Sequence, residues 1–105
     1  MLGLRPLYII LFCCVFTAQA QHVFKGAVVD ALSSVSIPNA HVKLNDSYGV
    51  VSDQNGRFEL SGLPSGTYLL EVSCVGFKGF KKQINLTKKV LYFDVVLQPD
   101  VLELS

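Results

Sequence analysis

The side chains that could perform catalysis or bind a metal are few and scattered along the sequence. Two of them are histidines, His22 and His41, which fall in different predicted strands and lack the close spacing of a local metal pair. His22 lies at the beginning of the first predicted strand, where the chain is expected to fray. His41 falls on the outward side of its strand. Both are therefore predicted to be surface histidines and not metal ligands or general bases.

The acidic residues do not form the pair of carboxylates that general acid–base catalysis requires. Asp94 is opposite in parity to the apolar face of the last predicted strand, so we expect it to face solvent. The others are spread along the chain: Asp30, Asp46, Asp53, Glu59, Glu71, Asp100 and Glu103. The sequence also lacks the motifs of zinc proteases, serine hydrolases and phosphate-binding loops. It therefore predicts no enzyme, no catalytic, cofactor-binding or metal-binding residue, and no cofactor.

The segment Asp53–Gly56, which reads DQNG, allows two interpretations. Its oxygen-bearing side chains at alternate positions are typical of the beginning of a calcium loop, but no bidentate glutamate follows at the required offset. A tight turn explains the same residues, with Asn55 and Gly56 supplying positive φ angles. We favour the turn.

The cysteines do not indicate a disulfide framework. Cys13 and Cys14 lie in an apolar run near the N-terminus, which leaves only Cys74 in the remainder of the chain. Cys74 lies in an apolar predicted strand and has no base nearby in sequence. It is therefore predicted to be a core residue and not a nucleophile.

The elements that must position these side chains are predicted to be strands. Turn signals recur at short intervals, and the runs between them alternate with a period of two, with no window of ten or more residues showing a helical period. The clear runs are 22–30, 40–45, 56–61, 67–75 and 90–97, and the weaker ones are 49–52 and 80–86. Short loops favour antiparallel neighbours. The fold is therefore predicted to be all-β, a seven-stranded antiparallel or mixed sandwich of two sheets.

The alternation assigns the inward side chains of each clear run. Those expected in the core are Phe24, Gly26, Val28, Ala40, Val42, Leu44, Phe58, Leu60, Tyr68, Leu70, Val72, Cys74, Leu91, Phe93, Val95 and Leu97. In the run 80–86, Lys82 shares the parity of the apolar residues. An edge strand would let this lysine reach water, so we expect this strand at an edge of its sheet.

The N-terminus has the three parts of a secretory signal: a basic residue, Arg5, an apolar run at 7–16, and small residues at Ala18 and Ala20. Residues 1–20 are therefore predicted to be a signal peptide that is cleaved after Ala20. A membrane anchor would need about 20 apolar residues, roughly twice this run. A lipoprotein signal would need a small residue before its cysteine, but Phe12 precedes Cys13.

The remainder of the chain is predicted to be one domain, 21–99, followed by a short linker or tail, 100–105. The sequence holds nine basic and eight acidic residues, and one of the basic residues, Arg5, lies in the predicted signal peptide. The mature chain is therefore neutral and lacks the clustered basic surface of a nucleic-acid-binding protein. No transmembrane helix is predicted in the mature chain.

Five short motifs follow one another in an order that resembles carboxypeptidase regulatory-like domains, over residues 23–99. Each has a physical role: glycines permit tight turns or close strand approach, a proline fixes a strand entry, and aromatic residues fill the core. The motifs are GAVVD at 26–30, IPNAHV at 37–42, SDQNGRF at 52–58, LPSGTY at 63–68 and VSCVGF at 72–77.

This resemblance implies a prealbumin-like (transthyretin-like) sandwich without catalytic residues. In Gram-negative bacteria such domains follow the signal peptide of TonB-dependent outer-membrane receptors, and the segment 97–104 is similar to the stretch that leads into their TonB box. The resemblance thus implies a non-catalytic periplasmic accessory or interaction domain of a nutrient receptor. Its location would be the periplasmic face of the outer membrane, and its partner the plug and barrel or another cell-envelope protein. The related hydroxyisourate hydrolases share the fold, but their histidine-rich and C-terminal motifs are absent.

The length of the chain leaves two expectations open. The sequence stops where the plug of a receptor would begin, so the first expectation is a fragment or truncated product of a receptor. The alternative is a free-standing secreted sandwich that binds a protein or a carbohydrate.

Overall fold

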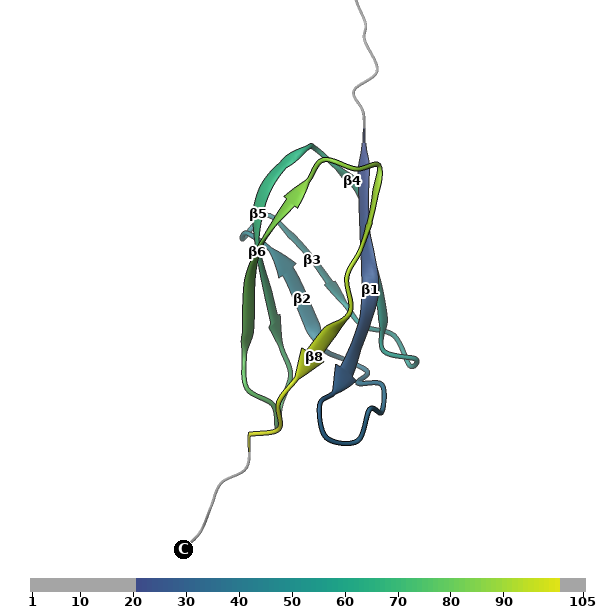
Figure 1. Cartoon of the computed structure of the whole chain (residues 1–105), viewed down its shortest axis with the longest axis vertical. Helices are drawn as coiled ribbons and strands as arrows, with labels where there is room; N and C mark the ends of the chain where they lie inside the picture. The colour runs from purple at the N-terminus through teal and green to yellow at the C-terminus, as the bar shows by residue number, and fades with distance from the viewer. Residues whose placement is uncertain (1–20, 101–105) are drawn as a thin grey trace, which may run out of the picture.

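The computed structural model describes residues 21–100 as eight strands in two sheets that face each other (Figure 1). One sheet contains β1, β4, β7 and β8, and the other has the order β3-β2-β5-β6. The strands are β1 (His22–Asp30), β2 (His41–Leu44), β3 (Tyr48–Val51), β4 (Arg57–Leu63), β5 (Gly66–Ser73), β6 (Phe80–Leu86), β7 (Val90–Tyr92) and β8 (Val95–Leu97). The predicted all-β, two-sheet sandwich is confirmed.

Strand β1 is the centre of the first sheet. It pairs antiparallel with β4 on one side and parallel with β7 and then β8 on the other. Its inward residues Phe24 and Val28 are fully buried, as the alternation predicts. The ring of Phe24 lies 5.4 Å from that of Phe58 on β4, so the aromatic residues of two neighbouring strands meet inside the sandwich.

The second sheet is antiparallel throughout, which fits its short connections. Val42 and Leu44 on β2 pair with Val72 and Leu70 on β5, and all four side chains are buried. Together the two sheets enclose one core: Phe24, Val28, Ile37, Ala40, Val42, Leu44, Phe58, Leu63, Tyr68, Leu70, Val72, Ile84, Leu86, Val95 and Leu97. Leu60, Cys74, Leu91 and Phe93, which were also expected inside, are only partly buried and pack against its border.

The predicted single strand 90–97 is two strands, β7 and β8, so the sandwich has eight strands instead of seven. The cause is the segment opposite Gly26. A Cβ atom on Gly26 would lie 1.8 Å from the carbonyl oxygen of Phe93, so the chain approaches β1 more closely here than any side chain allows. The Phe93 amide donates a hydrogen bond to the Lys25 carbonyl at 2.9 Å. The next bond to β1 is made by a side chain: the Ala27 amide donates to the Asp94 carboxylate at 3.1 Å, where a regular strand pair would use a backbone carbonyl.

Strand β6 lies at an edge of its sheet and Lys82 is exposed, as predicted. Its ammonium group lies 5.9 Å from the centre of the Phe93 ring, and Phe93 in turn lies 6.1 Å from Phe80. The lysine therefore sits on the aromatic pair that covers this open side of the sandwich. A charged residue at this position also discourages pairing with another strand.

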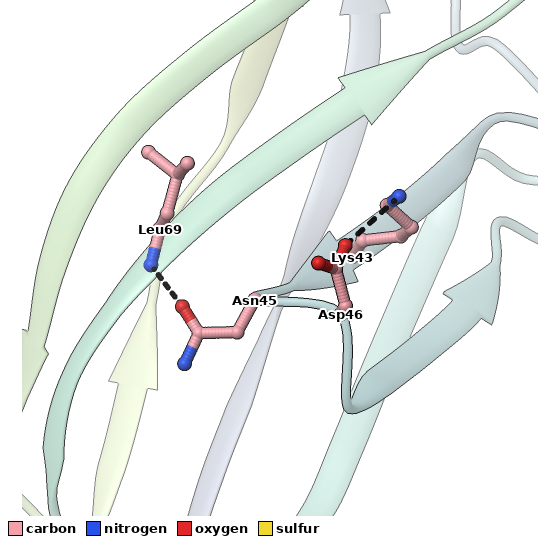
Figure 2. A network of polar contacts seen from close by, with 4 residues as sticks. All are labelled: Lys43, Asn45, Asp46 and Leu69. Carbon is pink, nitrogen blue, oxygen red and sulfur yellow. Dashed lines mark hydrogen bonds and ion pairs between the residues drawn. The ribbon is translucent and has the colours of Figure 1, made fainter.

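The β2–β3 connection is fixed by Asn45, which has a positive φ of 53°. Figure 2 shows its side-chain oxygen accepting from the Leu69 amide at 2.9 Å. The Asn45 amide in turn donates to the Leu69 carbonyl at 2.9 Å, so one residue ends the β2–β5 ladder with both its backbone and its side chain. The neighbouring ion pair of Lys43 with Asp46, 3.6 Å long and exposed, adds little stability.

Two side-chain hydrogen bonds tie loops to strands. The Ser52 hydroxyl, which is buried, accepts from the Ala40 amide and donates to the Ile37 carbonyl, both at 2.8 Å. The Tyr68 hydroxyl donates to the Pro64 carbonyl at 2.7 Å, which fixes the β4–β5 turn against the core. Both groups are thus satisfied within the fold and are not free for chemistry.

Candidate functional site

The two histidines occupy different places in the sandwich and do not converge. His41 is exposed on the outer face of β2, as predicted. The expectation that His22 frays is wrong: it is buried, it pairs with Leu63, and its ring Nδ1 bonds to the Lys88 carbonyl. The ring bond adds to the backbone pairing at the beginning of β1 and ties this strand to the β6–β7 turn. His22 is therefore a structural residue.

Cys74 lies one residue beyond the end of β5 and is half-buried against the core, so it packs less completely than predicted. Within residues 21–100, no group of three or more histidine, cysteine, aspartate or glutamate residues could hold a metal ion. The same part of the chain contains no helix that is long and apolar enough to cross a membrane.

The segment Asp53–Gly56 forms the predicted tight turn, with one difference. Gly56 has a φ of 75°, whereas Asn55 is not among the residues with positive φ. The Asp53 carboxylate accepts from the Asn55 amide at 2.8 Å and from the Arg57 amide at 2.9 Å. Both bonds are accepted by the same carboxylate oxygen, Oδ1, so the Asp53 side chain closes the turn.

An open hollow of about 690 Å³ lies along the outer side of β1, β4 and β7, next to the end of β3. Its lining combines small, apolar and charged residues: Lys25, Gly26, Ala27, Val50, Val51, Asp53, Arg57, Phe58, Glu59, Tyr92 and Asp94. The strand register brings these side chains together. Lys25 on β1 lies between its partners Glu59 on β4 and Tyr92 on β7. Two residues further along β1, Ala27 lies opposite Arg57. The small side chain of Ala27 leaves the space between the larger ones.

The hollow presents charged, hydrogen-bonding and aromatic groups. The Lys25 ammonium group lies 5.0 Å from the centre of the exposed Tyr92 ring, in a cation–π contact. Asp53 and Asp94 are occupied by backbone amides. No nucleophile stands beside a base in the hollow, and the groups that remain offer charge, hydrogen bonds and one aromatic face.

One ionisable group in the described chain has a clearly shifted pKa. Burial, and to a smaller extent the neighbouring Tyr48, raise the pKa of Tyr68 above its ordinary value. The rings of these tyrosines are 6.0 Å apart and nearly perpendicular. This shift belongs to a core residue that bonds to the Pro64 carbonyl, and so it reports on packing and not on an active site.

A search with family profiles matches residues 23–98 to the carboxypeptidase regulatory-like domain. The chain belongs to this family. The match confirms the resemblance drawn from the five motifs and covers almost all of the part that the structure describes as strands. A search of curated proteins found no match.

Solved structures share the fold of this carboxypeptidase regulatory-like domain at low sequence identity. Catechol 1,2-dioxygenase from Acinetobacter sp. ADP1 superposes with a TM-score of 0.65 at 14% identity, covering 81% of this chain and 54% of the enzyme. A type II cohesin–X-dockerin complex from Acetivibrio cellulolyticus gives 0.65 and 14%, over 74% of this chain and 58% of that one. The minor pilin GBS52 of Streptococcus agalactiae gives 0.65 and 14%, over 83% and 48%.

These likenesses establish the sandwich fold and nothing more, because the identities are so low. The chain also spans only 54% and 58% of the first two solved proteins. Sequence reasoning did not find the hollow, because its residues come from four strands and the segments between them. Most of these residues look like ordinary outward strand residues when each is considered by itself, and Gly26 and Phe58 were expected in the core. The only available signal was the small pair Gly26-Ala27 in the middle of a strand of larger residues.

Proposed function

We propose that this chain supplies the periplasmic accessory domain at the N-terminus of a TonB-dependent outer-membrane receptor, where it acts as a non-catalytic interaction module in nutrient uptake. The observation that carries the proposal is the order of segments: a predicted signal peptide at 1–20, the family's domain at 23–98, and a tail similar to the approach to a TonB box. The signal peptide and residues 101–105 lie outside the described residues.

The geometry supports an interaction role. The polar groups that could have been reactive instead hold backbone: His22 at the beginning of β1, Ser52 at the β1–β2 loop, and Asp53 in the β3–β4 turn. What remains free is the outer surface of the sheets. Sandwiches of this fold also occur in pilin subunits and in a cohesin–X-dockerin complex, so the fold is compatible with an interaction role.

An in-frame deletion of residues 21–99 from the receptor, with the signal peptide kept, tests the proposal. An accessory domain is a separate folding unit, so we expect the barrel still to assemble in the outer membrane and ligand-dependent uptake or its regulation to change. A matched control replaces the deleted segment with a flexible linker of the same length. Unchanged uptake and unchanged regulation in the deletion variant would refute the accessory role. A soluble periplasmic product without a barrel would favour the alternative, a free-standing secreted module.

A further inference from the structure

Exposed aliphatic residues are concentrated at the end of the sandwich where the described chain leaves it. Val75 is 97% exposed, Leu32 77%, Val35 62% and Val96 46%. They make up four of the seven large hydrophobic residues that face solvent within residues 21–100. Leu32 and Val35 lie in the β1–β2 loop, Val75 in the β5–β6 turn and Val96 on β8. We call these four residues the exit patch. Isolated exposed aliphatic residues are common, but a concentration at one end marks a contact surface.

Hydrogen bonds place the loop and the turn on either side of the departing chain. After β8, the Leu97 carbonyl accepts from Ala31 at the beginning of the β1–β2 loop, at 2.9 Å. The next carbonyl, that of Gln98, accepts from Lys78 beyond the β5–β6 turn, at 2.8 Å. Because consecutive residues of one segment hold both elements, that segment leaves the domain between them. In Figure 1 the two elements lie at the same end, opposite the beginning of β1.

The chain remains fixed until its last described residue. Pro99 forms a bridge with Phe77, and the Asp100 amide donates to the Gly76 carbonyl at 2.9 Å. Gly76 follows Val75 directly. The described chain therefore ends beside the turn that carries the most exposed aliphatic side chain of the patch.

The patch residues Leu32, Val35 and Val75 lie in short uncharged segments. Residues 31–36 and 74–77 contain no charged side chain, and the charged residues Asp30 and Lys78 flank these segments directly. Charged residues are depleted at the centre of docking surfaces and common at their polar border. This local arrangement is compatible with an interdomain contact.

From these observations we infer that the exit patch docks against the folded domain that continues the polypeptide beyond Asp100. This inference rests on the proposed function, under which that domain is the plug of the receptor. The partner must present an apolar surface to Leu32, Val35, Val75 and Val96. A contact of modest area is sufficient, because the covalent connection already holds the two surfaces together and removes most of the entropic cost of association. The accessory domain is then held in a fixed orientation on the plug.

Thiol labelling of the intact polypeptide in outer membranes tests this contact. In a Cys74→Ala background, Val75→Cys reports on the exit patch and Ser65→Cys, at the exposed β4–β5 turn of the opposite end, is the matched control. We expect maleimide to label Val75→Cys about tenfold more slowly than Ser65→Cys, as for a site that is docked about nine-tenths of the time. Adding Leu32→Asp should restore labelling at Val75→Cys and leave Ser65→Cys unchanged.

Three results would overturn the inference. Equal labelling of Val75→Cys and Ser65→Cys shows that the patch is free. Slow labelling that depends on protein concentration shows that a second copy covers it. Slow labelling that Leu32→Asp does not relieve shows a local effect at the turn. Mass spectrometry of the labelled polypeptide separates these results from failure of the proposed function, because it shows directly whether plug and barrel peptides belong to the same chain.

Discussion

Replacing Gly26 with alanine is the sharpest test of the packing between β1 and the β7–β8 segment. The added Cβ would lie 1.8 Å from the Phe93 carbonyl oxygen, where real Cβ atoms stay beyond 3.0 Å. The backbone at Phe93 must therefore move by at least about 1 Å. Such a shift disrupts the bond from Phe93 to Lys25 and the bond from Ala27 to Asp94.

The expected magnitude follows from these losses. Two hydrogen bonds at about 1 kcal/mol each and overpacking of at least about 1 kcal/mol give a total destabilisation of about 3 kcal/mol. With a urea slope of about 1 kcal/mol/M for a domain of this size, the unfolding midpoint should fall by about 3 M.

Gly79→Ala is the matched control, because no atom lies within 4 Å of its would-be Cβ and its φ is outside the left-handed region. This variant should unfold at the same urea concentration as the unmodified domain or slightly above it. Urea unfolding followed by circular dichroism measures both variants. A Gly26→Ala midpoint within about 0.5 M of the unmodified domain would refute the close approach of Phe93 to β1.

Three further predictions concern the core, an edge and pH. Ser52→Ala leaves the buried Ala40 amide and the Ile37 carbonyl without their partner, and should lower the free energy of unfolding by about 2 kcal/mol in urea melts; a loss below about 0.5 kcal/mol would contradict the buried bonds. Lys82→Val removes the charge that protects the β6 edge and should produce concentration-dependent association in light scattering, whereas a strictly monomeric variant would show that the lysine does not protect this edge. In ultraviolet titration, Tyr68 should ionise above the ordinary tyrosine pKa of 10.0, because its pKa in the folded domain is raised. The stability that this shift contributes is complete below pH 10.0 and is lost as the pH rises through the folded pKa. A Tyr68→Phe variant that loses stability over the same alkaline range as the unmodified domain would argue against this origin.

The sequence was sufficient for most of the fold because the alternation of apolar residues is a local property. Phe24, Val28, Val42 and Leu70 were assigned to the core by parity alone and are fully buried. Lys82 even indicated an edge strand, since a charge at an inward position needs access to water.

Features that depend on contacts between distant residues were beyond such reasoning. The burial of His22 depends on the Lys88 carbonyl, and the break between β7 and β8 depends on Gly26, so neither is visible in its own segment. The hollow and the exit patch have the same origin. Both gather residues from several elements, and only the sheet order and the route of the departing chain bring these residues together.

The central claim is that this domain is the first folded part of a TonB-dependent receptor. N-terminal sequencing and intact mass of the polypeptide that bears the domain, purified from the outer membrane, test it most directly. The account predicts a chain that begins at Gln21 and continues through a plug and a barrel. A mature polypeptide that lacks a plug and barrel, or one found only in the soluble periplasmic fraction, would contradict it.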